Sequence, residues 1–198
     1  MIARDRLDLP VNAALLIVDV QRAIDDPSWG VRNNPDAEAN IAALLAAWRA
    51  AGRPIFHIKH NSIEPRSTYR PGQPGNDFKP AAAPLPGETV IEKQTNAAFI
   101  GTDLEAGLRR ADIATLVIAG VITNNSVEAT ARMAGNLGFD TFVVSDATAT
   151  FGRTDLRGKV WPADDVHWLA LSNMDGEYAR VVSTAQLLAL VDPPGGTG

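Results

Sequence analysis

The chain alternates short, continuous apolar runs with segments of helical periodicity, and this alternation restricts its fold more than any other feature. Residues 13–20 (AALLIVDV) and 115–120 (TLVIAG) are mostly apolar, which is typical of strands buried on both faces of a parallel sheet. Residues 36–51 instead repeat apolar side chains at helical spacing. Further strands are predicted at residues 54–59, 89–92, 141–145 and 180–183, and further helices at residues 102–111, 124–137, 163–175 and 184–191. The pattern predicts an α/β fold in which helices cover both faces of a parallel sheet.

Length and composition are those of an ordinary soluble globular chain. The 198 residues fit a single domain spanning 1–198, with 45% hydrophobic and 21% charged residues. A net charge of −5 argues against a nucleic-acid partner, and no apolar run is long enough for a membrane-spanning helix. The first residues lack the apolar core of a signal peptide, so a cytoplasmic location is expected. The chain has no cysteine, which excludes disulfides, thiolate metal sites and a cysteine nucleophile.

Residues 61–89 differ from the rest of the chain in composition. They contain six prolines and three glycines, which is too many for regular structure. A disordered linker is one interpretation. The segment lies inside the strand–helix series, however, where long loops are usually functional, so an ordered active-site loop is favoured. The tail after residue 191 (DPPGGTG) is expected to fray.

Three polar features follow predicted strands. Asp19 ends the first apolar run, Lys93 follows the strand at 89–92, and Ser126 lies in the first turn of the helix expected after Gly120. In parallel α/β sheets the ligand crevice lies beyond the carboxyl ends of the strands, so these side chains are expected to converge. Taken singly, Asp19 could cap a helix, Lys93 could be a surface lysine, and Ser126 could be a second capping residue.

Four segments together resemble the isochorismatase-like cysteine hydrolases, over roughly residues 13–185. The segments are VDVQ (18–21), KQTNAAFIGTDL (93–104), GVITNNSVEATARMAGNLGF (120–139) and VSDATATF (144–151). The resemblance implies a three-layer, Rossmann-like αβα fold with a six-stranded parallel sheet of order 3-2-1-4-5-6. It also implies a homo-oligomer, either a dimer or a tetramer, that acts on a small molecule.

The resemblance further implies the roles of the site residues. The family's Asp–Lys–Cys triad maps onto Asp19, Lys93 and Ser126, and its non-proline cis peptide maps onto Val121–Ile122. The N–H groups of Ile122 and Ser126 would then form the oxyanion hole. The implied reaction is hydrolysis of a C–N bond in a small amide, ureide or carbamoyl compound, with no cofactor. The strand end HIKHNS lacks the Asp-x-His of metal-dependent relatives, so no metal is expected.

Serine at position 126 departs from the family pattern. A serine hydroxyl is much less acidic than a thiol and needs a well-matched base, which an aspartate paired with lysine is not. Three explanations remain open: an engineered Cys→Ser change that inactivates the enzyme, a naturally slow hydrolase, or a non-catalytic descendant that binds a small molecule. A further alternative is an isochorismatase-type vinyl-ether hydrolase, in which Asp19 is the general acid and no cysteine is needed.

Several polar and aromatic residues near these positions are candidates for substrate binding. His57 and His167 are expected to be structural, whereas His60 follows a strand end and is a candidate for the pocket wall. The full set of candidates comprises Trp29, His60, Tyr69, Arg70, Gln94, Asn96, Phe151 and Trp161.

Overall fold

A six-stranded parallel sheet organises the computed structural model, which describes residues 7–191. Its strands are β1 (Ala14–Val18), β2 (Ile55–His60), β3 (Thr89–Lys93), β4 (Thr115–Val121), β5 (Asp140–Ala149) and β8 (Arg180–Val182). They are ordered β3-β2-β1-β4-β5-β8, and every neighbouring pair is parallel. Because β8 is the sixth strand of this sheet along the chain, the predicted order 3-2-1-4-5-6 is confirmed. The tail after residue 191 lies outside the described residues.

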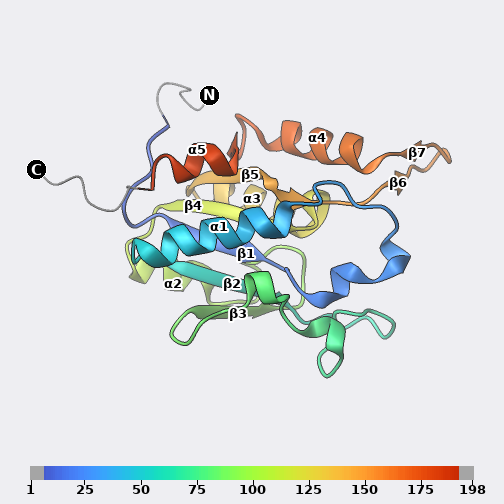
Figure 1. The fold of residues 1–198 in the computed structure, drawn as a ribbon, viewed down its shortest axis with the longest axis horizontal. Helices are drawn as coiled ribbons and strands as arrows, with labels where there is room; N and C mark the ends of the chain where they lie inside the picture. The colour runs from blue at the N-terminus through green and yellow to red at the C-terminus, as the bar shows by residue number, and fades with distance from the viewer. Residues whose placement is uncertain (1–6, 192–198) are drawn as a thin grey trace, which may run out of the picture.

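Helices cover both faces of the sheet, as Figure 1 shows. They are α1 (Ala37–Ala50), α2 (Leu104–Arg110), α3 (Glu128–Asn136), α4 (Ala163–Met174) and α5 (Thr184–Leu188). Alternate side chains of β1 divide between two apolar cores, since Leu15 packs with α1 and α5 while Leu16 packs with α2, α3 and α4. The predicted three-layer α/β architecture is therefore confirmed.

Local structure differs from the prediction in three places. Strand β5 continues to Ala149, beyond the predicted end at residue 145. A short hairpin of β6 (Arg153–Thr154) and β7 (Val160–Trp161) follows it and was not predicted, because each strand is only two residues long. The helix expected over 124–137 begins instead with a π-helical turn, η5 (Thr123–Val127), before α3. Ser126 therefore belongs to a wider turn, of a kind that is frequent at functional sites.

The proline-rich segment, residues 61–89, is held in place by two buried amide side chains. Gln21 accepts a hydrogen bond from the His60 N–H (2.7 Å) and donates to the carbonyls of His60 and Asn76 (3.0 and 2.9 Å). Asn76 in turn donates to the carbonyl of Tyr69 (2.8 Å). These bonds hold the segment against the carboxyl ends of β1 and β2. The neighbouring loops contain four short 3₁₀ helices, η1 (Arg22–Asp25), η2 (Pro27–Trp29), η3 (Pro74–Asn76) and η4 (Pro80–Ala82).

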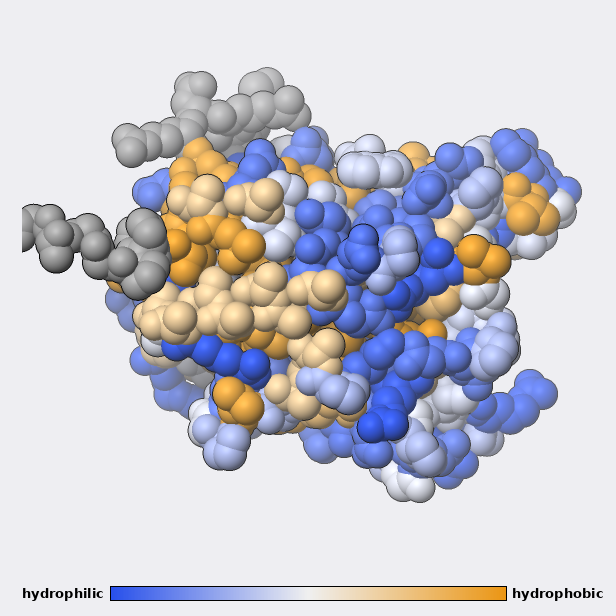
Figure 2. All heavy atoms as spheres, in the orientation of Figure 1, coloured by the Kyte–Doolittle hydropathy of each residue, from blue (hydrophilic) through white to orange (hydrophobic). Residues whose placement is uncertain are grey.

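The surface is uneven in polarity. On the face drawn in Figure 2, apolar residues gather over α1 and α5, and hydrophilic residues gather over the segments beyond the carboxyl ends of the strands. Within residues 7–191, no helix combines the length and apolar character needed to cross a membrane.

Candidate active site

Asp19 stands directly beyond the carboxyl end of β1 and is only 4% exposed. Its backbone adopts the left-handed conformation (φ 54°), which non-glycine residues visit rarely and which is often found at functional sites. Carboxylate atom Oδ2 accepts a hydrogen bond from Lys93, whereas Oδ1 is buried and has no hydrogen-bond partner among the described residues. One carboxylate oxygen is thus fixed and the other remains available to a reacting group.

Lys93 ends the edge strand β3 and has a completely buried side chain. Its Nζ donates to Asp19 Oδ2 (2.7 Å), to the carbonyl oxygen of Thr95 (3.0 Å) and to Ser126 Oγ (3.3 Å). An ammonium group has three N–H donors, and each has an acceptor here. The lysine therefore joins the carboxylate and the hydroxyl in one charged, hydrogen-bonded cluster.

Ser126 is 6% exposed and is carried by the π-helical turn after β4. The peptide bond Val121–Ile122 before this turn is cis. Gly120 has φ +128°, and a Cβ atom there would lie 2.1 Å from the carbonyl oxygen of Val18. Only glycine allows β4 to approach β1 this closely, so Gly120 brings the Ser126 turn against the end of the strand that precedes Asp19.

Burial shifts the pKa values of Asp19 and His60. Desolvation raises the pKa of the Asp19 carboxyl, although Lys93 and the hydroxyl of Ser126 both favour its charged form. Burial lowers the pKa of His60, with Asp19 acting in the opposite direction. The lowered pKa favours a neutral imidazole at His60 near pH 7, and its buried Nδ1 atom has no hydrogen-bond partner among the described residues.

A cavity of about 130 Å³ opens onto this cluster. Four of the candidate substrate-binding residues line this inner cavity beside Asp19 and Ser126, namely Trp29, His60, Tyr69 and Asn96. Ser67 and Asn125 also line it and were not predicted to do so. The ring of Tyr69 packs edge-on against His60, and its hydroxyl donates to the Asp19 carbonyl (3.5 Å). The proline-rich segment thus supplies part of the cavity wall.

A second cavity, of about 280 Å³, adjoins the first. The two share Trp29, Ile122 and Asn125 in their linings. Phe151, another predicted candidate, lines this outer cavity and stacks on Trp29 with ring centroids 5.5 Å apart. Arg153 also lines it and was not among the predicted residues. Together the cavities have room for a small molecule that reaches from Ser126 towards the β6–β7 hairpin.

Three candidate residues are placed elsewhere, which corrects the sequence-based assignment. Arg70 is exposed and donates to the Pro65 carbonyl within its own loop (3.1 Å). Gln94 is exposed, follows the end of β3 and lines neither cavity. Trp161 lies in the hairpin, where its indole N–H donates a hydrogen bond to Asp155 Oδ2 (3.1 Å).

The two histidines predicted to be structural lie outside both cavities. His57 is fully buried and contacts Glu88 through Nε2 (2.8 Å). His167 is also fully buried and contacts the Thr123 hydroxyl through Nδ1 (3.0 Å), at the start of the turn that carries Ser126. Among residues 7–191, no group of three or more His, Asp or Glu side chains is arranged to hold a metal ion.

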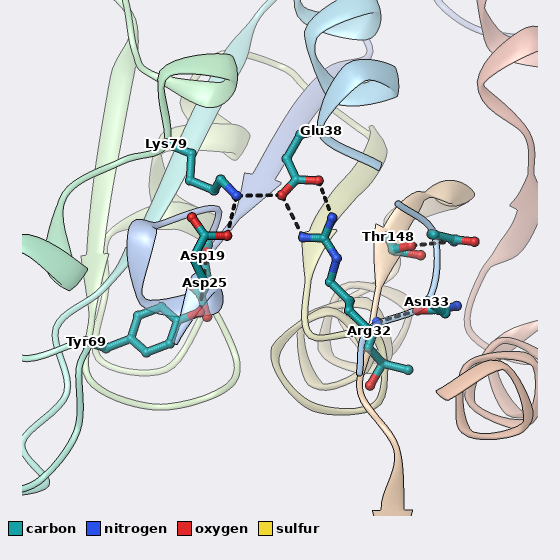
Figure 3. A network of polar contacts seen from close by, with 10 residues as sticks. Asp19, Asp25, Arg32, Asn33, Glu38, Tyr69, Lys79 and Thr148 are labelled. Atoms are coloured by element: carbon teal, nitrogen blue, oxygen red, sulfur yellow. Dashed lines mark hydrogen bonds and ion pairs between the residues drawn. The ribbon is translucent and has the colours of Figure 1, made fainter. Parts of the chain in front are cut away.

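A polar network joins the loop after β1 and the proline-rich segment to α1 (Figure 3). Glu38 binds both terminal nitrogens of Arg32 (2.6 and 2.7 Å) and also accepts from Lys79 (2.8 Å), which reaches Asp25 as well (2.6 Å). Burial alone would raise the pKa of Glu38, but the bonds from Arg32 and Lys79 lower it to about 2. The Glu38 carboxylate therefore holds Arg32, which follows Trp29, and Lys79 of the proline-rich segment. Through Lys79 it also holds Asp25, which precedes Trp29.

We expect Glu38→Gln to lower the free energy of unfolding by on the order of 2 kcal/mol at pH 7. The pKa of Glu38 falls from its ordinary 4.5 to about 2 on folding, so its contribution is complete above pH 4.5 and is lost as the pH falls towards 2. Urea unfolding at pH 7 and pH 3 should show the gap between variant and parent narrowing in acid. Glu105→Gln is the matched control, since its partner Arg109 is exposed and 3.5 Å away. Equal effects of the two substitutions would contradict the assignment.

A carboxylate, an ammonium and a hydroxyl gathered beyond the carboxyl ends of a parallel sheet form a site of the kind found in α/β enzymes. The isochorismatase domain matches residues 13–186, and the chain belongs to the isochorismatase family.

The chain is similar to several known proteins, two of which are named as members of the isochorismatase family. It is 43% identical over 175 residues to the isochorismatase family protein YrdC of Bacillus subtilis, covering 88% of this chain and 94% of YrdC. An isochorismatase-family protein from Chromobacterium violaceum, known from a crystal structure, is 56% identical with a TM-score of 0.92, covering 96% and 98% of the two chains. Streptothricin hydrolase of Streptomyces noursei is 31% identical, covering 91% of this chain and 66% of that enzyme.

Proposed function

We propose that the chain hydrolyses a C–N bond in a small amide, ureide or carbamoyl compound. The observation that carries this proposal is the cluster in which Lys93 Nζ lies 2.7 Å from Asp19 Oδ2 and 3.3 Å from Ser126 Oγ, beside a cavity. The free Oδ1 atom of Asp19 supplies a proton acceptor in the same place. The kinship with streptothricin hydrolase supports a hydrolytic reaction.

In the first step, Ser126 Oγ attacks the substrate carbonyl carbon while its proton passes to Asp19. A C–O bond forms and the electron pair of the carbonyl bond moves onto the substrate oxygen. The N–H groups of Ile122 and Ser126 are proposed to hold this oxyanion. Lys93 keeps the carboxylate oriented and donates to the attacking oxygen.

In the second step, the oxyanion collapses and the C–N bond breaks. The leaving nitrogen takes the proton from Asp19, which leaves an ester on Ser126. Water then attacks the ester, with Asp19 accepting its proton and returning a proton to Ser126 Oγ as the acid product departs. Serine is the weak part of this sequence, because its hydroxyl is far less acidic than the thiol of the family pattern, so we propose that the chain as it stands is slow.

A vinyl-ether hydrolase is the second candidate, and the raised pKa of Asp19 favours it. A protonated Asp19 would donate its proton to the terminal vinyl carbon, and water would then add to the resulting oxocarbenium ion. This reaction uses the aspartate and the cavity but does not need a nucleophile at position 126. The two candidates therefore differ in what they require of Ser126.

Two substitutions separate these candidates. In assays with a panel of small amides and ureides, and with isochorismate, we expect Asp19→Asn to lower any hydrolysis by roughly 10²–10⁴-fold, because it removes the proton acceptor and donor. Ser126→Ala should abolish amide hydrolysis and leave vinyl-ether hydrolysis unchanged. If neither substitution changes turnover of any substrate, Asp19 and Ser126 are not the reacting groups. If the parent turns over none of them and binds ligand equally well without Asp19, the chain is a binding protein.

We also propose that the chain acts in the cytoplasm as one domain that assembles into a homo-oligomer. The support for assembly is apolar surface on α4, where Trp168 and Leu169 are 57% and 64% exposed. Light scattering on the purified protein would give the number of copies.

A further inference from the structure

We infer that the substrate of this site carries a carboxylate, and that Arg153 binds it at the far end of the outer cavity. The inference deepens the proposed function, since it concerns the same site and names the class of compound that the site accepts. It depends on where Arg153 lies, on its lack of an ion pair with any described residue, and on the absence of carboxylates from the lining of the outer cavity.

Arg153 is tied structurally to the residue beside Ser126. Its Nη2 atom donates to Asn125 Oδ1 (3.0 Å), and Asn125 lines both cavities. Arg153 itself lines the outer cavity and not the inner one, and it also lines a separate surface cavity with Glu128 and Asp165. A substrate whose carbonyl lies at Ser126 can therefore extend past Asn125 and place its other end against the guanidinium group.

Arg153 makes no ion pair with any described residue. Several other arginines of the chain are paired with carboxylates, including Arg32, Arg49, Arg132 and Arg180. A guanidinium group has five N–H donors, and the bond to Asn125 uses only part of this capacity. In a chain of net charge −5, an arginine that faces a cavity without a carboxylate partner is a suitable receptor for an anion.

The remaining charges of the two cavities do not oppose an anion. No aspartate or glutamate is among the lining residues of the outer cavity. In the inner cavity, the charge of Asp19 is matched by the Lys93 ammonium 2.7 Å away, and burial lowers the pKa of His60. The cationic end of the combined cavity is thus at Arg153, and the reacting groups are at the other end.

The shape of the site suggests how such a substrate is built. The stacked rings of Trp29 and Phe151 line the outer cavity between the two ends, so an apolar or planar spacer fits there. The planar guanidinium matches a carboxylate through two parallel hydrogen bonds. The expected substrate therefore has an amide or ureide carbonyl at one end, a short spacer, and a carboxylate at the other end.

The experiment compares matched ligands that differ only in terminal charge. Glutaramate carries a carboxylate, pentanamide is its neutral counterpart, and 4-aminobutanamide carries an ammonium group. Calorimetry with the unaltered chain is expected to show that glutaramate binds about 10- to 100-fold more tightly than pentanamide. Arg153→Gln should remove this preference, and Arg153→Glu should transfer it to 4-aminobutanamide. Arg157→Gln is the control, because Arg157 is an exposed arginine of the same hairpin that lines neither cavity.

Turnover by the Ser126→Cys variant, with and without Arg153→Gln, separates this inference from the proposed function. Loss of the preference for glutaramate in kcat/KM, with pentanamide unaffected, would support both. An equal loss for all amides would mean that Arg153 only holds Asn125 in place, and would overturn the inference while leaving the hydrolase intact. Arg153-dependent binding of glutaramate without hydrolysis of any amide would retain the inference and refute the proposed reaction. If no carboxylate binds better than its neutral counterpart, the inference is wrong.

Discussion

Replacing Ser126 with cysteine is expected to raise the rate of amide hydrolysis by on the order of 10²-fold, the lower end of what well-matched proton transfer contributes to catalysis. A serine must lose its proton to Asp19 during the attack, and a carboxylate is a poor base for an alcohol. A thiol has an ordinary pKa near 8.5, so it can be ionised before the attack begins. The substitution therefore removes the need to transfer a proton from an alcohol to Asp19 during the attack.

The surroundings of position 126 favour a thiolate. Lys93 Nζ lies 3.3 Å from Ser126 Oγ, and a cation at this distance lowers the pKa of a thiol. Burial of the position acts in the opposite direction, since it raises the pKa of a thiol, but it also leaves the charge of Lys93 little screened by solvent. We expect the thiol of the variant to have a pKa below its ordinary value.

This expectation can be measured without ambiguity because the chain has no cysteine of its own. The rate of alkylation by iodoacetamide as a function of pH reports the pKa of the single thiol in Ser126→Cys. Ammonia release from the amide panel reports turnover, with Ser126→Ala as the control for background hydrolysis. A thiol with an ordinary pKa and no gain in turnover would show that the cluster does not activate a nucleophile at this position.

The sheet and its strand order could be predicted because the apolar pattern and the resemblance to the family both extend over most of the chain. The position of the cluster of Asp19, Lys93 and Ser126 could be predicted for a simpler reason. Parallel strands share one carboxyl edge, so Asp19 after β1, Lys93 at the end of β3 and Ser126 after β4 all lie at that edge. This common location follows from topology, whereas the contacts among the three side chains also depend on the π-helical turn that carries Ser126.

The outer cavity could not be predicted in the same way. Arg153 and Trp161 follow β5 in a segment without apolar periodicity, and the hairpin there is fixed by pairing of two-residue strands and by the bond from Trp161 to Asp155. Arg70 likewise turns back onto its own loop at Pro65. Side-chain direction in such segments depends on tertiary contacts, which the sequence pattern does not encode. The sequence therefore predicted which residues lie at the strand ends better than the arrangement of the segments beyond them.

Removing the ammonium group alone is expected to be costly for stability. Lys93→Met leaves the buried Asp19 carboxylate without its partner, and breaking a buried ion pair from one side typically costs about 3–5 kcal/mol. Methionine preserves the length and apolar stem of the lysine, so loss of packing contributes little. Urea unfolding at pH 7 measures the effect. The double variant Asp19→Asn/Lys93→Met should recover most of the loss, because it removes both charges and because asparagine tolerates the left-handed backbone at position 19 (φ 54°).

The difference in the free energy of unfolding between Lys93→Met and the parent should shrink as the pH falls. Burial raises the pKa of Asp19 above its ordinary value even in the presence of Lys93, and losing Lys93 removes a group that lowers it. The folded state then binds a proton more readily than the unfolded state, so acidification towards the ordinary pKa of 3.8 stabilises the variant relative to the parent. The double variant has no carboxyl group at position 19 and should lack this pH dependence.

The same set of variants tests why the pair is present at all. Hydrolysis should be lost in both the single and the double variant, although only the single variant is unstable. Near-equal stability of the parent and the double variant would mean that the charged pair contributes to chemistry rather than to folding. If Lys93→Met instead unfolds at the same urea concentration as the parent, or if the double variant is no more stable than Lys93→Met, the two side chains are not coupled in the way that their 2.7 Å contact implies.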